Sequence, residues 1–276
     1  MLSSTSRWLT YLNAVLYATL GGVLFVFPGK MAPVFAWKVS AFVTMTIGGW
    51  CLGNAWLAWI SARRWQWPLV YSAMIYLWLF GLIEAAVVLG FREKLALAHP
   101  VAWLYLTALG ANVLAALVGI LDWLRRRPVS VFSGARVGTG HRAAVVAFVV
   151  FVGFLGGYGM VAQIGSPGTN GGIFPEEMSL FTLRSFAAFY LALALAALPL
   201  IMERSLSTLL HHSIASYGLI AAITAAAFAN IGLFDFRQRP GGLLYIGAYL
   251  IVGIPLLFAF SRLGTGLRGN IGRERA

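Results

Sequence analysis

The sequence predicts an all-α integral membrane protein with about eight transmembrane helices, arranged as two parallel tandem four-helix repeats. Three observations predict this fold. Hydrophobic residues make up 60% of the chain, charged residues make up only 10%, and a set of short motifs occurs twice in the same order. About a quarter of the residues in a soluble domain are charged. The composition therefore excludes an ordinary soluble domain.

Eight apolar segments are each long enough to cross about 30 Å of hydrocarbon at about 1.5 Å per residue. We expect helices, because lipid offers no partners to unpaired backbone groups and the segments lack the alternation of barrel strands. The first segment lacks a small-residue cleavage site, so we expect it to remain in the mature protein. The expected segments are 9–27, 39–61, 68–90, 100–121, 143–163, 182–202, 213–234 and 241–261.

The internal repeat is predicted by motifs that return in order, with changes of spacing confined to loops. Because each unit has an even number of crossings, both units enter the membrane in the same sense. A pseudo-two-fold axis along the membrane normal would then relate them. The recurring pairs are Gly21-Gly22 with Gly156-Gly157, Phe27-Pro28 with Phe174-Pro175, Phe91-Arg92 with Phe236-Arg237, and Pro100 to Leu106 with Pro240 to Ile246.

The domain organisation follows from the repeat. We expect residues 1–127 to form the first four-helix repeat and residues 143–262 to form the second. The segment 128–142 combines arginines with proline, glycine and serine, which is typical of a flexible basic linker on the cytoplasmic side. Residues 263–276 are glycine-rich and basic, and we expect a mobile tail.

The net charge of +12 is interpreted by its distribution across the membrane. Thirteen of the lysines and arginines fall on the side of the N-terminus and seven on the other side. The positive-inside tendency therefore predicts a multi-pass protein, in the cytoplasmic membrane of a prokaryote, with both termini in the cytoplasm. The cytoplasmic arginines would contact anionic lipid head groups. Nucleic acid is not an expected partner, because no folded basic domain lies outside the membrane.

Glu84 is the only acidic or basic residue deep within an expected span. It lies about 9 Å below the outer end of its segment at about 1.5 Å per residue. An ionised carboxylate at that depth costs roughly 2.5 kcal/mol or more, so Glu84 should be protonated, paired or beside a wet cavity. One interpretation is a proton site or a polar contact for a ligand. The alternative is a structural hydrogen bond to a neighbouring helix or a contact with Arg92.

Three amides, Asn54, Asn112 and Asn230, are the other candidates for a polar site inside the membrane. Asn230 follows Ala229, the approximate repeat counterpart of Glu84, which predicts a shared polar layer in the outer half of the bundle. Amides in membrane helices more often form interhelical hydrogen bonds than ligand contacts. Both interpretations remain open for all three.

An outward loop carries the second group of candidate residues. Glu176 and Glu177 precede the sixth expected segment, and Arg184 follows closely enough to form an ion pair with them above the bundle. We expect this cluster to contribute to binding. If the protein were an enzyme, the two glutamates could act as general acids only in environments that separate their pKa values. Glutamates in loops are usually solvated, which disfavours that role.

No cofactor or metal is expected from the sequence. The four histidines, at 99, 141, 211 and 212, fall at loop or interface positions, so a pair of histidines in mid-membrane for haem is absent. The His-Glu-x-x-His pattern and the phosphate-binding loop are also missing. Cys51 is the single cysteine, so no intrachain disulfide can form.

These observations favour a non-catalytic membrane protein that binds or transports a small hydrophobic or amphipathic molecule, or a lipid, in an outward-facing cavity between the repeats. Glu84 would couple such transport to protons. A scaffold or accessory subunit bound to other membrane proteins is the first alternative. A membrane enzyme acting on a lipidic or isoprenoid substrate is the second.

Overall fold

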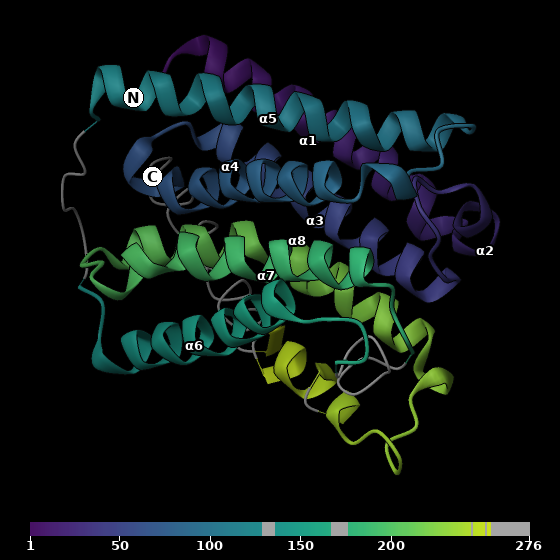
Figure 1. The fold of residues 1–276 in the computed structure, drawn as a ribbon. Helices are drawn as coiled ribbons and strands as arrows, with labels where there is room; N and C mark the ends of the chain where they lie inside the picture. The colour runs from purple at the N-terminus through teal and green to yellow at the C-terminus, as the bar shows by residue number, and fades with distance from the viewer. Residues whose placement is uncertain (129–135, 167–175, 244, 252, 255–276) are drawn as a thin grey trace, which may run out of the picture.

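The computed structural model describes residues 1–128, 136–166, 176–243, 245–251 and 253–254, and these residues form an all-helical protein (Figure 1). Its long helices run side by side. They are α1 Ser4–Val26, α3 Ala41–Arg64, α4 Trp67–Gly90, α5 Pro100–Arg126, α6 Thr139–Val161, α7 Leu180–Ile201 and α8 Leu206–Ala229. The short elements are α2 Pro28–Met31 and the 3-10 turns η1 Ala32–Val34, η2 Arg92–Lys94 and η3 Ile231–Leu233.

Among the described residues, six helices are long and apolar enough to cross a bilayer: α1, α4, α5, α6, α7 and α8. The prediction of a helical, polytopic membrane protein is thereby confirmed. The second expected span, 39–61, corresponds to α3, which is long but less apolar than these six. The eighth, 241–261, is described only as a shorter apolar helix, Gly241–Ile251, because residues 255–261 lie outside the described ranges.

The position of α3 explains its lower hydropathy. It packs against α1, α4 and α8, and most of its residues are buried by them. A helix that is shielded from lipid does not need an apolar outer face, and small residues at its surface let neighbouring helices approach closely. A Cβ on Gly53 would lie 2.5 Å from Leu219 Cα of α8, and one on Gly21 of α1 would lie 2.7 Å from the Leu52 nitrogen of α3. Glycine is therefore required at both contacts.

Helices α1, α3, α4 and α5 form a closed four-helix unit, which we call the first bundle. Helix α6 packs along α7. Helices α7 and α8 each pack on the first bundle, α8 against α3 and α4 and α7 against α4. We call these contacts of α7 and α8 with the first bundle the seam.

Two ends of the protein can be distinguished. Helix α1 begins where α3 and α5 end, and we call this the basic end because of its arginines. Arg7 Nε donates to the carbonyl of Ala62 at 2.8 Å, and Ser6 Oγ donates to Asp122 Oδ2 at 3.0 Å. Helix α6 begins at Thr139, within the stretch expected to be linker; residues 129–135 and the expected tail, 263–276, lie outside the described ranges.

Candidate functional site

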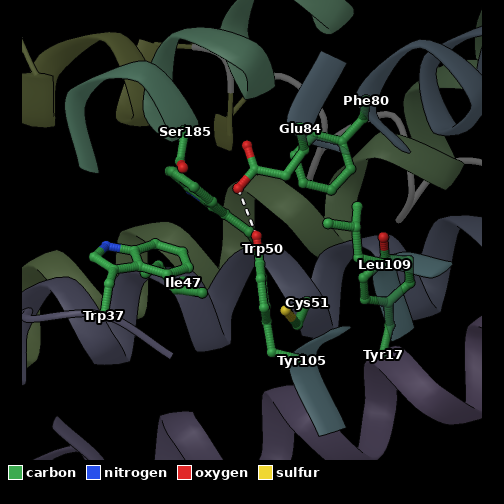
Figure 2. A pocket seen from close by; sticks show the side chains of 10 residues that line it. All are labelled: Tyr17, Trp37, Ile47, Trp50, Cys51, Phe80, Glu84, Tyr105, Leu109 and Ser185. Atoms are coloured by element: carbon green, nitrogen blue, oxygen red, sulfur yellow. Dashed lines mark hydrogen bonds between the residues drawn. The ribbon is translucent and has the colours of Figure 1, made fainter. Parts of the chain in front are cut away.

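Glu84 is buried near the end of α4 that lies opposite the basic end, with 3% of its surface exposed. The Tyr105 hydroxyl, from α5, donates to Glu84 Oε1 at 2.6 Å (Figure 2). The second carboxyl oxygen, Oε2, has no hydrogen-bond partner in the described protein. Glu84 forms no ion pair among the described residues, so the contact with Arg92 considered from the sequence is not made. The carboxyl group therefore keeps one oxygen available.

Tyr105 is held in place by rings from the segment that precedes α3. Its ring lies edge-on to Phe35, with centroids 5.5 Å apart, and edge-on to Trp37, with centroids 5.2 Å apart. Such edge-to-face pairs contribute about 0.5–1.5 kcal/mol each beyond the area they bury. The phenol is consequently fixed in position to donate its hydroxyl to the carboxyl group.

A small internal cavity lies beside Glu84, with a volume of about 20 Å³. Tyr17 of α1, Cys51 of α3 and Ser185 of α7 also line it (Figure 2). The Ser185 hydroxyl is near Glu84 but lacks hydrogen-bond geometry. A cavity of this size holds about one water molecule, whereas sites for drug-sized ligands measure about 300–1,000 Å³. The cavity at Glu84 is thus far smaller than a site for the small molecule expected from the sequence.

Aromatic side chains lie between this cavity and the end of the bundle opposite the basic end. Trp37 stacks on Phe181 of α7 with ring centroids 4.3 Å apart, and Phe181 stacks on Phe91, just after α4, at 5.1 Å. Trp37 Nε1 also donates to Thr182 Oγ1 at 3.0 Å. We call Trp37, Phe91 and Phe181 the aromatic cover. It joins α4 and the segment before α3 to α7, so it spans the seam.

Two of the candidate amides lie deeper in the first bundle and do not line the cavity. Asn54 Oδ1 accepts a hydrogen bond from the Tyr76 hydroxyl at 2.7 Å. Asn112 Nδ2 donates to the Leu77 carbonyl at 3.0 Å, and Asn112 Oδ1 accepts from Asn13 Nδ2 at 3.2 Å. The two amides therefore link helices, which is the structural interpretation.

The third amide, Asn230, is the C-cap of α8 and is half-buried. Its Nδ2 donates to the Ala226 carbonyl at 2.9 Å and contacts Met45 Sδ at 3.4 Å. Glu84 lies within α4, six residues before the helix ends at Gly90, whereas Asn230 follows the last residue of α8. The two side chains thus do not form the common polar layer that the sequence predicts.

The cluster of Glu176, Glu177 and Arg184 is arranged differently from the expectation. Glu176 accepts a hydrogen bond from Ser40 Oγ, at the start of α3, and Glu177 is exposed. Arg184 Nη2 donates to the Ala162 carbonyl, at the end of α6, at 2.7 Å. The expected ion pair between Arg184 and the glutamates is not formed, because Arg184 and Glu176 bond to other segments and Glu177 points to solvent. The prediction of that ion pair is wrong.

Sequence reasoning missed Asn13, Tyr17, Tyr105 and Ser185, which surround Glu84 or lie along the same bundle. A signal was available for two of them, since Asn13 and Tyr17 fall on one face of α1 with Ser6 and Thr10. Within the described ranges, no three histidine, cysteine or acidic side chains gather in a way that could hold a metal ion.

Comparison with models of known protein families, with curated proteins and with solved structures finds no match. The function has to be inferred from the chemistry of the site.

Proposed function

We propose that the protein binds a small hydrophobic or amphipathic molecule at the Glu84 cavity and carries it through the membrane in a process coupled to protons. The observation that supports this proposal is Glu84 Oε2, a buried carboxyl oxygen that lines a cavity and has no protein partner. An ionisable group inside a membrane protein is costly unless it has a function or a partner. Glu84 has only one partner for its two oxygens.

The hydrogen bond from Tyr105 makes the role of each oxygen clear. Oε1 accepts from the phenol, so a neutral Glu84 carries its proton on Oε2 and presents it to the cavity. A carbonyl or hydroxyl oxygen on the bound molecule would accept that proton in a hydrogen bond. Because the cavity is of one-water size, the proposal requires the seam or the aromatic cover to open before the molecule can bind.

Such an opening could occur by movement of two related units, and the helix lengths favour a duplicated unit. Thr139, the first residue of α6, lies 135 residues after Ser4, the first of α1, and the two helices have the same length of 23 residues. Leu206, the first residue of α8, lies 139 residues after Trp67, the first of α4; both helices have 24 residues. Matched helices of this kind favour a duplicated unit.

Contacts at the seam also support the two-fold relation. Suppose that α7 is the counterpart of α3 and α8 is the counterpart of α4. A two-fold axis then turns the contact of α3 with α8 into a contact of α7 with α4, and both contacts are present. Trp50 of α3 stacks on Phe189 of α7, which lies 139 residues later, with centroids 4.6 Å apart and planes 7° apart. Counterpart residues in contact are expected on a two-fold axis. Rocking of one unit against the other about this axis would open the cavity.

The binding role is tested by native mass spectrometry of protein released from membranes in mild detergent. We expect wild-type protein to retain a co-purified small molecule and Glu84→Gln to lose it, because the amide presents a different donor in the same space. Glu93→Gln is the control, since Glu93 is exposed on η2. Equal retention by all three proteins, or no bound molecule on any of them, would contradict the proposal.

A scaffold subunit is the second candidate, and the packing of the seam favours it. Trp50 also contacts Phe186, and Tyr76 and Phe80 of α4 contact Phe189, so aromatic rings fill much of the space between the groups. A filled seam suits a protein that presents its outer surface to partners. Isolation of a stable larger complex from native membranes would support this candidate, whereas a lone monomer would count against it.

A further inference from the structure

The buried face of α1 carries a row of polar side chains, of which only Tyr17 lines the Glu84 cavity. Ser6, Thr10, Asn13 and Tyr17 are each at most 4% exposed. They lie three or four residues apart, so they share one face of the helix. The row extends over about 16 Å at about 1.5 Å per residue. We call these four residues the polar row; it runs from the basic end to the cavity, which Tyr17 lines.

Hydrogen bonds within the protein satisfy only part of this row. Thr10 Oγ1 donates to the Ser6 carbonyl at 2.8 Å, and Asn13 Nδ2 donates to Asn112. Asn13 Oδ1 has no partner among the described residues, and the Tyr17 hydroxyl is near Asn112 without hydrogen-bond geometry. Buried polar atoms in native proteins are satisfied by protein or by water.

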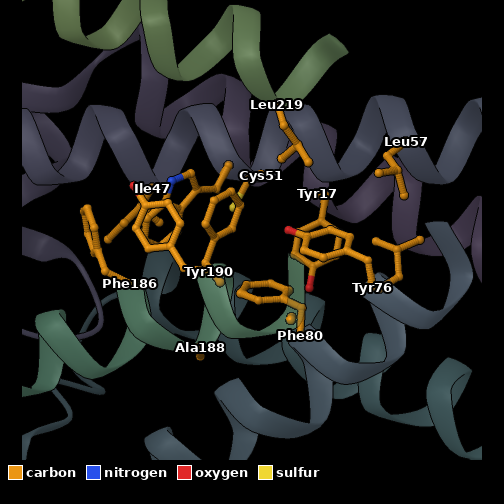
Figure 3. Packing of buried hydrophobic residues seen from close by; sticks show 14 of the residues in the cluster. Tyr17, Ile47, Cys51, Leu57, Tyr76, Phe80, Phe186, Ala188, Tyr190 and Leu219 are labelled. Carbon is orange, nitrogen blue, oxygen red and sulfur yellow. The ribbon is translucent and has the colours of Figure 1, made fainter. Parts of the chain in front are cut away.

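Further unsatisfied polar atoms occur on α3, which packs against α1. Asn54 Nδ2 and Ser61 Oγ are buried without a partner in the described protein. Asn54 accepts from Tyr76, and Figure 3 shows the hydroxyl groups of Tyr76 and Tyr17 in the same part of the core. The interior of the first bundle therefore holds several buried polar atoms without a partner in the described protein.

The two ends of the polar row differ in access to solvent. At the basic end, Ser6 donates to Asp122, and Asp122 is paired with the exposed Arg126 at 2.6 Å. At the other end, the aromatic cover lies between the Glu84 cavity and the outer surface. We therefore expect protons to enter the row from the basic end and not past the aromatic cover.

Helix α6, the counterpart of α1 in the proposed repeat, lacks most of these polar groups. The residues 135 positions after Thr10, Asn13 and Tyr17 are apolar: Val145, Phe148 and Val152 of α6. Only the counterpart of Ser6, His141, is polar. A helix of the same length therefore forms without polar side chains at the three positions nearest the cavity.

We propose that the polar row holds a file of water molecules that carries protons between the basic end of the bundle and Glu84. This inference rests on the proposed function, because it requires Glu84 to gain and lose a proton. In each step an O–H bond of the carboxyl group breaks as an O–H bond to a water molecule forms, and that water passes another proton along the file. The titratable groups that face Glu84 are Tyr17, Cys51 and Tyr105, from α1, α3 and α5; Ser185, from α7, does not titrate.

Infrared spectroscopy of the protein in lipid nanodiscs tests the proposal. The C=O band of the protonated Glu84 carboxyl is identified as the band that Glu84→Gln removes, and its shift after a change from H₂O to D₂O gives the rate of proton exchange. Loss of one hydrogen-bonding group for water raises the barrier by about 1.4 kcal/mol, which slows exchange about tenfold. We expect this slowing for Asn13→Leu and for Thr10→Val, which keeps the side-chain shape.

Two control variants make the comparison specific. Phe148→Leu places leucine at the position of α6 that corresponds to Asn13. Asn13→Ser keeps a polar group in the row. In both variants the Glu84 carboxyl should exchange its proton at close to the wild-type rate. Wild-type exchange in Thr10→Val and Asn13→Leu, with the Glu84 band intact, would overturn the water file and leave the proposed function standing. Absence of the band from the wild-type protein would instead overturn the role of Glu84, and with it this inference.

Discussion

The contact between α3 and α8 makes a quantitative prediction about Gly53. A Cβ at this position would lie 2.5 Å from both Leu219 Cα and Leu219 Cδ2. Carbon atoms in favourable contact are about 3.5–4.0 Å apart, so Gly53→Ala creates an overlap of roughly 1 Å with a backbone atom. A side chain cannot relieve this overlap by changing rotamer, because the Cα of a helix is involved. Helix α8 must therefore move away from α3.

Overpacking of this kind costs about 1–3 kcal/mol. Gly22→Ala is the matched control, since Gly22 also lies inside a helix but a Cβ there meets no atom within 4 Å. Alanine has a helix propensity better than that of glycine by about 0.8–1.0 kcal/mol, so this control should be neutral or slightly stabilising. Thermal unfolding in mild detergent, followed by circular dichroism, measures both variants. Equal midpoints for Gly53→Ala, Gly22→Ala and the wild type would refute the close approach of α8 to α3.

Two further predictions concern the Glu84 site. Tyr105→Phe leaves Glu84 Oε1 buried without its donor, which should lower the free energy of unfolding by about 1–3 kcal/mol. A Glu84→Leu, Tyr105→Phe double variant should recover part of the loss, and full additivity of the two effects would contradict the hydrogen bond. Trp37→Ala should open the aromatic cover and speed the reaction of the single, buried Cys51 with a small methanethiosulfonate. Trp103→Ala, at an exposed tryptophan, should leave that rate unchanged; an equal increase would indicate general loosening.

The sequence predicted the helices well where hydropathy alone decides them. The segment expected at 68–90 is α4 at Trp67–Gly90, and the one expected at 182–202 is α7 at Leu180–Ile201. The segment expected at 213–234 corresponds to α8, Leu206–Ala229. The helix begins earlier than expected, because the residues of its first turns are helical although their polar side chains lower the local hydropathy. Hydropathy locates the apolar part of a helix and not its capped ends.

The surroundings of Glu84 were predicted less completely than the helices, because they depend on how the helices pack. A carboxyl group in an apolar segment is visible from composition, so the sequence singles out Glu84 as a candidate. Tyr105 was not found, because tyrosine is common at membrane interfaces and its contact with Glu84 depends on how α4 and α5 pack. Asn230 was placed at the wrong depth, because matching short motifs between the two halves does not locate the helix end that Asn230 caps.

Arg184 illustrates the same limit for charges. Proximity in sequence predicted an ion pair with Glu176, but the start of α7 lies beside the end of α6, where the Ala162 carbonyl lacks a helical partner. Glu176 instead reaches across to Ser40. Both outcomes depend on tertiary packing that charge patterns alone do not determine. Which end of the protein faces the cytoplasm stays a prediction from the distribution of arginines.

The central claim is that Glu84 is a neutral, reactive carboxyl group inside the membrane, and labelling with dicyclohexylcarbodiimide tests it most directly. This apolar reagent modifies protonated carboxyl groups in apolar surroundings. Mass spectrometry of the labelled protein in membranes at neutral pH should find the adduct on Glu84, with Glu93 unmodified and no adduct in Glu84→Gln. Labelling confined to exposed acids, with Glu84 unmodified even after prolonged treatment, would contradict the claim.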